Sequence, residues 1–165
     1  MELRSQDSDL RARLLAPVLE AMLRICRSAG CVETGGILVG YYTQDLDCAI
    51  ITRVSAVPKD SRHAAAVFVR GTAGLRPWLR RLWERKRREY YLGEWHFHPM
   101  ASPYPSPRDI SETRRNAKDP KRNCSVPLLV IIGGDPRKGC ILKAFVYAKR
   151  GLVELMDDRS QQSTN

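Results

Sequence analysis

The order of apolar and polar positions predicts that helices alternate with strands along this chain. Near the N-terminus, apolar residues recur at intervals of three and four, which is the period of an amphipathic helix. Gly30 follows the last of them as a natural C-cap, and Pro17 suits the first turn of a helix that begins late. The residues of this apolar stripe are Leu10, Leu14, Leu15, Val18, Leu19, Met22, Leu23 and Cys26.

Further along, strand patterns surround two shorter helices. A helical stripe of leucine and tryptophan covers 75–83, and a short polar helix is predicted over 107–118. Strands are predicted over 36–43, 48–58, 64–70, 90–99, 126–134, 140–150 and 151–157. The pattern therefore predicts an α/β or α+β class, with a mixed β-sheet flanked by helices in a single domain over residues 1–157. The last residues, 158–165, are expected to form a flexible tail.

Composition agrees with one ordinary globular domain. The chain has 165 residues, 43% of them hydrophobic and 28% charged. No apolar run approaches the roughly 20 residues that a membrane helix needs, and the polar N-terminus lacks the apolar core of a secretory signal. Five cysteines without a Cys-x-x-Cys pair favour reduced thiols and a cytoplasmic location, with no membrane partner.

The charge is strongly positive and unevenly placed. Lysine and arginine number 28 against 18 acidic residues, a formal net charge of +10. Residues 70–90 hold eight basic and two acidic residues, and residues 108–122 hold six and three. Nucleic acid is the first partner that such a charge suggests. Because the excess is concentrated beside an apolar helical stripe and around Asp109, we expect one basic helix face and a basic rim that favour an acidic protein, and not a nucleic-acid partner.

The candidate chemistry gathers around the strand predicted over 90–99. His96 and His98 stand two residues apart, so their side chains point to one face of a strand. Ser106 and Asp109 follow at the start of the next helix. Two imidazoles and one carboxylate are three N/O ligands that leave a fourth position open, which is the pattern of a catalytic zinc site. Glu33 is a candidate general base beside such a site.

Each of these signals has a plainer interpretation. His-x-His alone is weak evidence for a metal, and Ser106 with Asp109 also reads as a helix cap with Pro107 at the first helical position. Glu94 shares the strand face of the histidines and is a rival base or a residue that supports them. Two glycines after Glu33, at 35 and 36, permit close approach of backbones.

The complete set resembles the JAB1/MPN/Mov34 family, the JAMM zinc metallopeptidases. The resemblance covers roughly residues 10–150 and rests on Glu33 in ETGGILVG, His96-Phe97-His98-Pro99, and Ser106-Pro107-Arg108-Asp109. By position, it implies that His96, His98 and Asp109 bind one Zn²⁺ per chain. It further implies that Glu33 is the general acid/base, that Ser106 stabilises the oxyanion, and that the fold is a cytidine-deaminase-like MPN/JAB domain. No motif position is missing, so the resemblance implies an active enzyme.

Within that family, the short chain with GEWHFHP is similar to bacterial JAB proteins encoded beside activating-like and conjugating-like enzymes, including those of antiviral CBASS operons. The resemblance implies an isopeptidase that releases a ubiquitin-like or other conjugated protein from its target. Two alternatives remain: a peptidase that processes a sulfur-carrier protein, and a RadC-like DNA-associated protein. Substrate-binding residues are not identified. Trp95 and Phe97 are expected in the core, and the loop 100–105 is expected over the metal.

Overall fold

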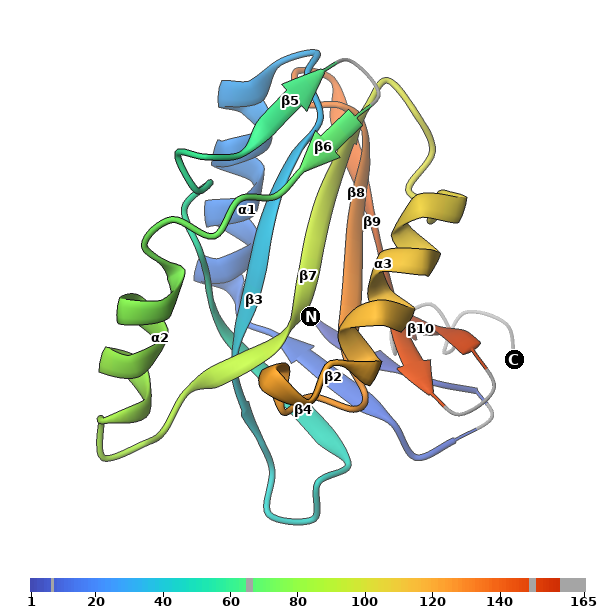
Figure 1. The fold of residues 1–165 in the computed structure, drawn as a ribbon. Coiled ribbons are helices and arrows are strands. Elements are labelled where there is room, and N and C mark those ends of the chain that lie inside the picture. The colour runs from blue at the N-terminus through green and yellow to red at the C-terminus, as the bar shows by residue number, and fades with distance from the viewer. Residues whose placement is uncertain (7, 65–66, 149–150, 158–165) are drawn as a thin grey trace.

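The computed structural model describes residues 1–6, 8–64, 67–148 and 151–157, and Figure 1 shows their arrangement. The tail predicted over 158–165 lies outside the described residues. The helices are α1 (Ala16–Ala29), α2 (Leu75–Trp83), α3 (Pro107–Lys118) and the 3-10 turn η1 (Pro120–Arg122). The strands are β1 (Glu2–Arg4), β2 (Arg11–Leu14), β3 (Thr34–Tyr42), β4 (Cys48–Val54), β5 (Arg62–Ala64), β6 (Val67–Val69), β7 (Tyr90–Pro99), β8 (Leu128–Asp135), β9 (Gly139–Ala148) and β10 (Gly151–Asp157).

The main sheet is mixed and curves until it closes. Its strands follow the order β1-β10-β9-β8-β7-β3-β4-β2, and β1 pairs with both β10 and β2 to complete the ring. β7 runs parallel to β8 and β2 runs parallel to β4, whereas the other neighbours are antiparallel. β5 and β6 form a separate hairpin. The predicted class, a mixed sheet with flanking helices, is confirmed.

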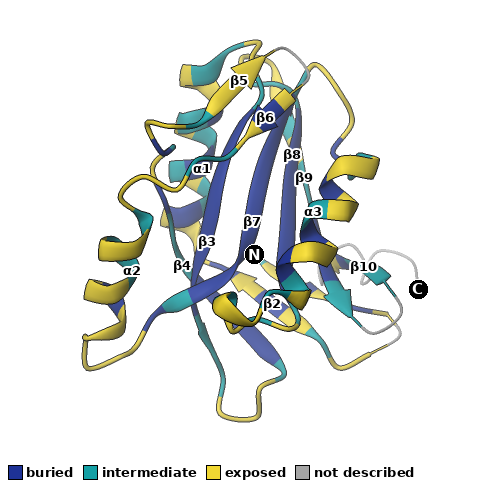
Figure 2. Ribbon diagram, viewed as in Figure 1, coloured by how far each residue is buried: buried dark blue, intermediate teal, exposed yellow. Residues whose placement is uncertain are grey.

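The two faces of the central strands bury different partners. On one face, Val18, Met22 and Cys26 of α1 pack in the largest apolar cluster of the described chain, with Trp95 and Phe97 of β7. Both aromatic side chains are fully buried there, as the sequence predicted. On the other face, Leu82 of α2 packs against Ile37, Val39 and Tyr91. Figure 2 shows the result, a buried group of central strands between helices whose outer surfaces are exposed.

A bulge at Gly93 decides which residues of β7 face which side. Opposite β3, Leu38 pairs with Gly93 and Val39 pairs with Tyr91, so Leu92 is an extra residue in β7. Leu92 and Trp95 therefore both belong to the core beneath α1, although they are three residues apart. After this reset, the strand alternates regularly, and Glu94, His96 and His98 lie on the face opposite Trp95 and Phe97.

Several predicted boundaries were wrong in ways that have physical reasons. The first residues of the apolar stripe do not join the helix: Arg11–Leu14 form β2, in which Ala12 and Leu14 alternate into the core. The late start predicted for the helix is confirmed, since α1 begins at Ala16 with Pro17 in its first turn. The strand β1 was not predicted. The single strand expected over 64–70 is instead the hairpin β5–β6, part of which lies outside the described residues.

The basic segment also differs from its prediction. The basic helix face expected within 70–90 was taken to include residues 85–88, but α2 ends at Trp83 and these residues follow it in an exposed connection to β7. Two of them lie over aromatic rings: the Arg87 guanidinium is 5.0 Å from the Tyr41 ring centre, and that of Arg88 is 5.0 Å from the Trp83 ring centre. In the described part of the chain, no helix is long and apolar enough to cross a membrane.

The bulge generates a test of the fold. We expect Gly93→Ala to lower the free energy of unfolding by at least about 3 kcal/mol, because its backbone has φ +154° and a Cβ atom there would lie 2.0 Å from the Leu128 carbonyl oxygen in β8. Gly139→Ala is the matched control, since Gly139 has φ +150° and no atom within 4 Å of the added Cβ. We expect it to cost about 1 kcal/mol. If urea denaturation shows equal losses of unfolding free energy in the two variants, the close β7–β8 contact does not have this role.

Candidate metal centre

The structure brings His96, His98 and Asp109 together at the C-terminal end of β7. One ligand atom from each residue lies within 4.8 Å of the others. The two histidines reach the same face of β7 through the alternation set by the bulge, and Asp109 approaches from the first turn of α3. The three residues are only 6%, 9% and 5% exposed, so the cluster is largely shielded from solvent.

The contacts inside this cluster are those of charged partners. Nδ1 of His96 lies 2.6 Å from Oδ1 of Asp109, and Nε2 of His98 lies 3.5 Å from Oδ2. Burial opposes the protonated form of His96, but the carboxylates of Asp109 and Glu94 outweigh it and raise the pKa of His96 to about 9. Burial likewise opposes ionisation of Asp109, but hydrogen bonds from the histidines and Ser106 hold its pKa below the ordinary range. The site therefore favours an ionised carboxylate.

A helix cap holds Asp109 in place. Ser106 is the N-cap of α3, and its hydroxyl accepts a hydrogen bond from the Asp109 backbone N–H at 3.2 Å. The Asp109 carboxylate in turn accepts from the Ser106 backbone N–H at 2.8 Å. This is a capping box with Asp in the third helical position and Pro107 in the first turn. The capping interpretation of this segment is confirmed, and the cap also aims Asp109 at the histidines.

Ser106 has a second bond that the sequence did not indicate. Its hydroxyl donates to Oδ2 of Asp109 at 2.6 Å, the same oxygen that lies nearest His98. The Ser106 hydroxyl proton is therefore directed at a candidate metal ligand in this structure. For Ser106 to donate to a substrate oxygen, its hydroxyl has to turn away from the carboxylate.

Glu33 lies directly before β3 and is half-buried. Its backbone is fixed by the β5 strand: its N–H donates to the Ala64 carbonyl at 3.2 Å, and its own carbonyl accepts from Nδ1 of His63 at 2.9 Å. Burial raises the pKa of the Glu33 carboxyl, the Asp109 charge raises it further, and His98 and His96 oppose the shift. The next residue, Thr34, pairs with Phe97 of β7, so Glu33 lies beside the end of the strand that carries the histidines.

The glycine after Thr34 allows this approach. A Cβ atom on Gly35 would lie 2.2 Å from the Trp95 carbonyl oxygen and 3.2 Å from the His96 ring, so only glycine lets β3 pass this close to β7. Phe68 of the β6 strand meets the His96 ring edge-on, with ring centres 5.8 Å apart. The hairpin therefore supports both Glu33 and His96, a role that no sequence pattern had assigned to it.

The donor set fits a divalent transition metal. Two imidazole nitrogens and one carboxylate oxygen converge, and their count and type match three-ligand catalytic zinc sites. Binding requires an unprotonated His96 nitrogen, so a metal ion and the His96 proton compete. The roles of His96, His98 and Asp109 as ligands, and of Glu33 and Ser106 in catalysis, stay predictions.

The sequence pointed to Glu94 beside the histidines but missed the side chains that hold it. Glu94 accepts hydrogen bonds at 2.9 Å from Arg70 and from Asn116, which come from the segment after β6 and from α3. Neither Arg70 nor Asn116 belongs to a recognisable motif, and their approach depends on the packing of α3 and the hairpin on β7. Only the strand position of Glu94 itself signalled its presence.

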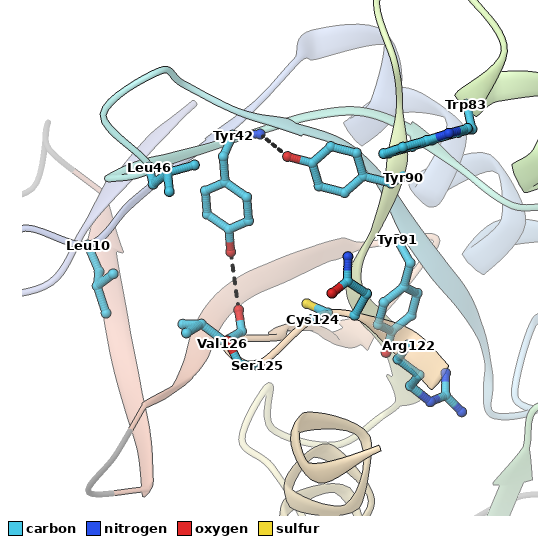
Figure 3. A pocket seen from close by; sticks show the side chains of 11 residues that line it. Leu10, Tyr42, Leu46, Trp83, Tyr90, Tyr91, Arg122, Cys124, Ser125 and Val126 are labelled. Atoms are coloured by element: carbon cyan, nitrogen blue, oxygen red, sulfur yellow. Dashed lines mark hydrogen bonds between the residues drawn. The ribbon is translucent and has the colours of Figure 1, made fainter. Parts of the chain in front are cut away.

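A separate cavity lies at the opposite end of β7. It has a volume of about 670 Å³ and is lined in part by Tyr42, Trp83, Tyr90, Tyr91 and Val126. Figure 3 shows how the Tyr42 hydroxyl donates to the Val126 carbonyl, while the Tyr90 hydroxyl accepts from the Tyr42 backbone N–H. None of His96, His98 and Asp109 lines this cavity, so it is separate from the candidate centre.

Comparison with known proteins agrees with this geometry. The family model described as prokaryotic homologues of the JAB domain matches residues 15–145. The chain is 42% identical over 128 residues to the CD-NTase/cGAS isopeptidase of Enterobacter hormaechei subsp. hoffmannii, covering 78% of this chain and 70% of that protein. It is 30% identical over 125 residues to the probable metalloprotease y4qB of Sinorhizobium fredii, covering 72% and 73%.

A solved structure shows the same fold. The solution structure of protein DSY2949 from Desulfitobacterium hafniense matches with a TM-score of 0.59 and 26% identity, over 87% of this chain and 88% of that one. The family resemblance read from the motif is confirmed by the family model and by both relatives. The chain belongs to the prokaryotic JAB-domain family and is a hydrolytic enzyme of the JAMM type.

Proposed function

We propose that this chain is a zinc isopeptidase that releases a conjugated protein from its target by hydrolysing the bond at the C-terminal carbonyl. The observation that supports this most strongly is the position of Glu33 beside a buried His–His–Asp cluster, in a chain of the JAB family. A base, three metal-type ligands and a hydroxyl at one strand end are the parts needed for hydrolysis of an amide.

In this proposal His96, His98 and Asp109 hold the zinc ion. When bound, zinc supplies a Lewis acid that polarises a carbonyl oxygen and makes water a better nucleophile at neutral pH. The low pKa of Asp109 keeps its carboxylate ionised, and thus able to bind a cation, across the physiological range. The capping box holds that carboxylate at the start of α3.

Glu33 is proposed to carry the proton. Its pKa is raised by burial, which makes its carboxylate a stronger base than an exposed glutamate. It takes a proton from the attacking water and delivers it to the departing amine, which must be protonated to leave. The two backbone bonds to His63 and Ala64 fix the start of its side chain during both transfers.

Ser106 is proposed to stabilise the developing oxyanion. A hydroxyl donor directed at such an oxygen is typically worth a few kcal/mol in the transition state. Because its hydroxyl donates to Asp109 in this structure, the role requires a rotation of the side chain when substrate is present. Asp109 keeps its bond from the Ser106 backbone N–H meanwhile.

The substrate class follows from the relative named CD-NTase/cGAS isopeptidase, so we propose a conjugated protein of the CD-NTase kind, as in CBASS-type antiviral systems. Activating-like and conjugating-like enzymes are then the expected partners. Among the described strands the main sheet is closed, so we expect an extended C-terminal tail to pair with the separate β5–β6 hairpin. The five cysteines are all free, which agrees with action in the cytoplasm.

The base assignment can be separated from the metal assignment. We expect Glu33→Gln to lose at least about a hundredfold in kcat on a conjugated substrate, because the amide cannot accept the water proton. Bound zinc, measured by elemental analysis, should stay near one per chain. In His96→Ala and Asp109→Ala, zinc itself should be lost. Full turnover in Glu33→Gln would overturn its role as base, and normal zinc content in both other variants would overturn the ligand assignment.

The basic segment 85–88 is proposed to dock an acidic part of the substrate protein. The four residues are exposed and lie before β7, whereas the metal ligands lie at its other end. A ten-residue strand spans about 30 Å, so this segment can only contact substrate far from the scissile bond. The contact would therefore matter for a folded substrate and not for a short peptide.

Replacing Arg85, Lys86, Arg87 and Arg88 by Gln tests this docking. We expect about a tenfold rise in KM for a conjugated protein at low salt, with unchanged zinc content and unchanged hydrolysis of a short peptide. Neutralising four exposed arginines elsewhere (Arg4, Arg13, Arg24 and Arg27) is the control for total charge. The proposal is wrong if the control raises KM equally.

A further inference from the structure

Glu94 is a buried carboxylate that the proposed reaction does not use. Its side chain is 9% exposed, and that of its partner Arg70 is 8% exposed. Burying an ion pair gives little net stability, since the cost of desolvation offsets the attraction. Fold stability therefore does not explain why this pair is buried. Glu94 lies two residues from the candidate metal ligand His96, which suggests a role at the metal centre.

The contacts of Glu94 are divided between its two oxygens. Oε1 accepts from Arg70 and Asn116 at 2.9 Å each and lies 3.6 Å from Nη1 of Arg122. The Tyr91 hydroxyl is 3.4 Å from the same oxygen. Oε2 is the oxygen nearer to His96, 3.9 Å from Nε2. The donors therefore hold one oxygen and leave the other directed at the histidine.

His96 in turn has one carboxylate at each ring nitrogen. Nδ1 faces Asp109 at 2.6 Å, and Nε2 faces Glu94. A metal-binding histidine usually donates its other ring N–H to a carboxylate or carbonyl, which fixes the tautomer and the ring orientation. The 3.9 Å separation exceeds a hydrogen bond, and a shift of about 1 Å or one bridging water would complete it.

The same helix braces both carboxylates. Asp109 and Asn116 are seven residues apart on α3, two turns, and so lie on one face of the helix. Asp109 meets His96 and Asn116 meets Glu94, so α3 is fixed to β7 at two points. The network thereby sets the distance between the helix that bears one ligand and the strand that bears the other two.

We propose that Glu94, held by Arg70 and Asn116, is the positioning residue of the metal centre: it accepts a hydrogen bond from the Nε2–H of His96 and so leaves Nδ1 free to bind the metal. This rests on the proposed metal site.

Metal affinity, measured by competition with a chelator, tests the proposal without reference to activity. We expect Glu94→Gln to weaken zinc binding about 10- to 100-fold. Because that variant leaves Arg70 buried without its partner, its unfolding midpoint should fall as well. The double variant Arg70→Met/Glu94→Met removes both charges, so its unfolding midpoint should largely recover while zinc binding stays weak. Recovery of both would show that Glu94 acts only through fold stability and would overturn the proposal.

Glu89→Gln is the matched control. Glu89 is also a buried carboxylate, bonded to Arg53 at 2.9 Å, but it precedes β7 and does not face the histidines. We expect it to lower the unfolding midpoint and leave zinc affinity within about twofold of wild type. If the zinc affinity of Glu94→Gln is also within about twofold of wild type, the positioning role is overturned.

Two further measurements separate the positioning role from the site itself. Imidazole ¹⁵N shifts of the zinc-loaded protein should show a protonated His96 Nε2, and zinc on Nε2 would contradict the proposal. The chelator competition, repeated on His96→Ala, should show that zinc binding is abolished. Intact binding in that variant would refute the metal centre, a result distinct from a failure of the role of Glu94.

Discussion

The structure depends on one strand meeting two opposite demands. Over its last residues, β7 must bury Trp95 and Phe97 beneath α1 and present His96 and His98 on its other face. Because side chains alternate between the two faces of a strand, both demands are met only if the odd-numbered residues of this part of β7 face α1. The bulge at Gly93 supplies that phase, because it inserts an extra residue opposite β3 and resets the alternation before Glu94. A bulge beside a functional site is thus a requirement of this arrangement and not an irregularity.

The candidate centre is then completed by local structure of an ordinary kind. A serine N-cap, a proline in the first turn and an acidic third residue begin α3, as they begin many helices. Here the acidic residue of the cap is also the carboxylate that meets the histidines. The capping hydrogen bonds that stabilise the start of the helix therefore also fix the Asp109 side chain. Forming the site then costs little additional conformational entropy.

Charge balance explains why this centre is surrounded by arginine, asparagine and serine donors. Asp109 and Glu94 bring two negative charges to a region that is almost fully buried. Each carboxylate is kept ionised by donors from several elements, among them Arg70, Asn116 and Ser106. Removal of one member of such a network destabilises the folded state, because the remaining charge is left buried and unpaired. The charge balance of the centre therefore depends on polar side chains outside the motif as well as on the motif.

The sequence by itself determined the elements that carry the motif. The strand over 90–99 and the helix over 107–118 were predicted with the bounds that the structure gives, because both have strong local signals: a proline at the strand end, and a cap and proline at the helix start. The family could likewise be recognised from the spacing of Glu33, the histidine pair and the Ser-x-x-Asp segment.

Tertiary structure alone decided what surrounds that motif. Closure of the sheet through β1, the β5–β6 hairpin against Glu33, and the donors to Glu94 all depend on contacts between segments far apart in the chain. A periodic pattern reports which face of a segment is apolar, but it holds no information on which other segment covers that face. The bulge is the clearest case, since its consequence for His96 exists only when β7 pairs with β3 and β8.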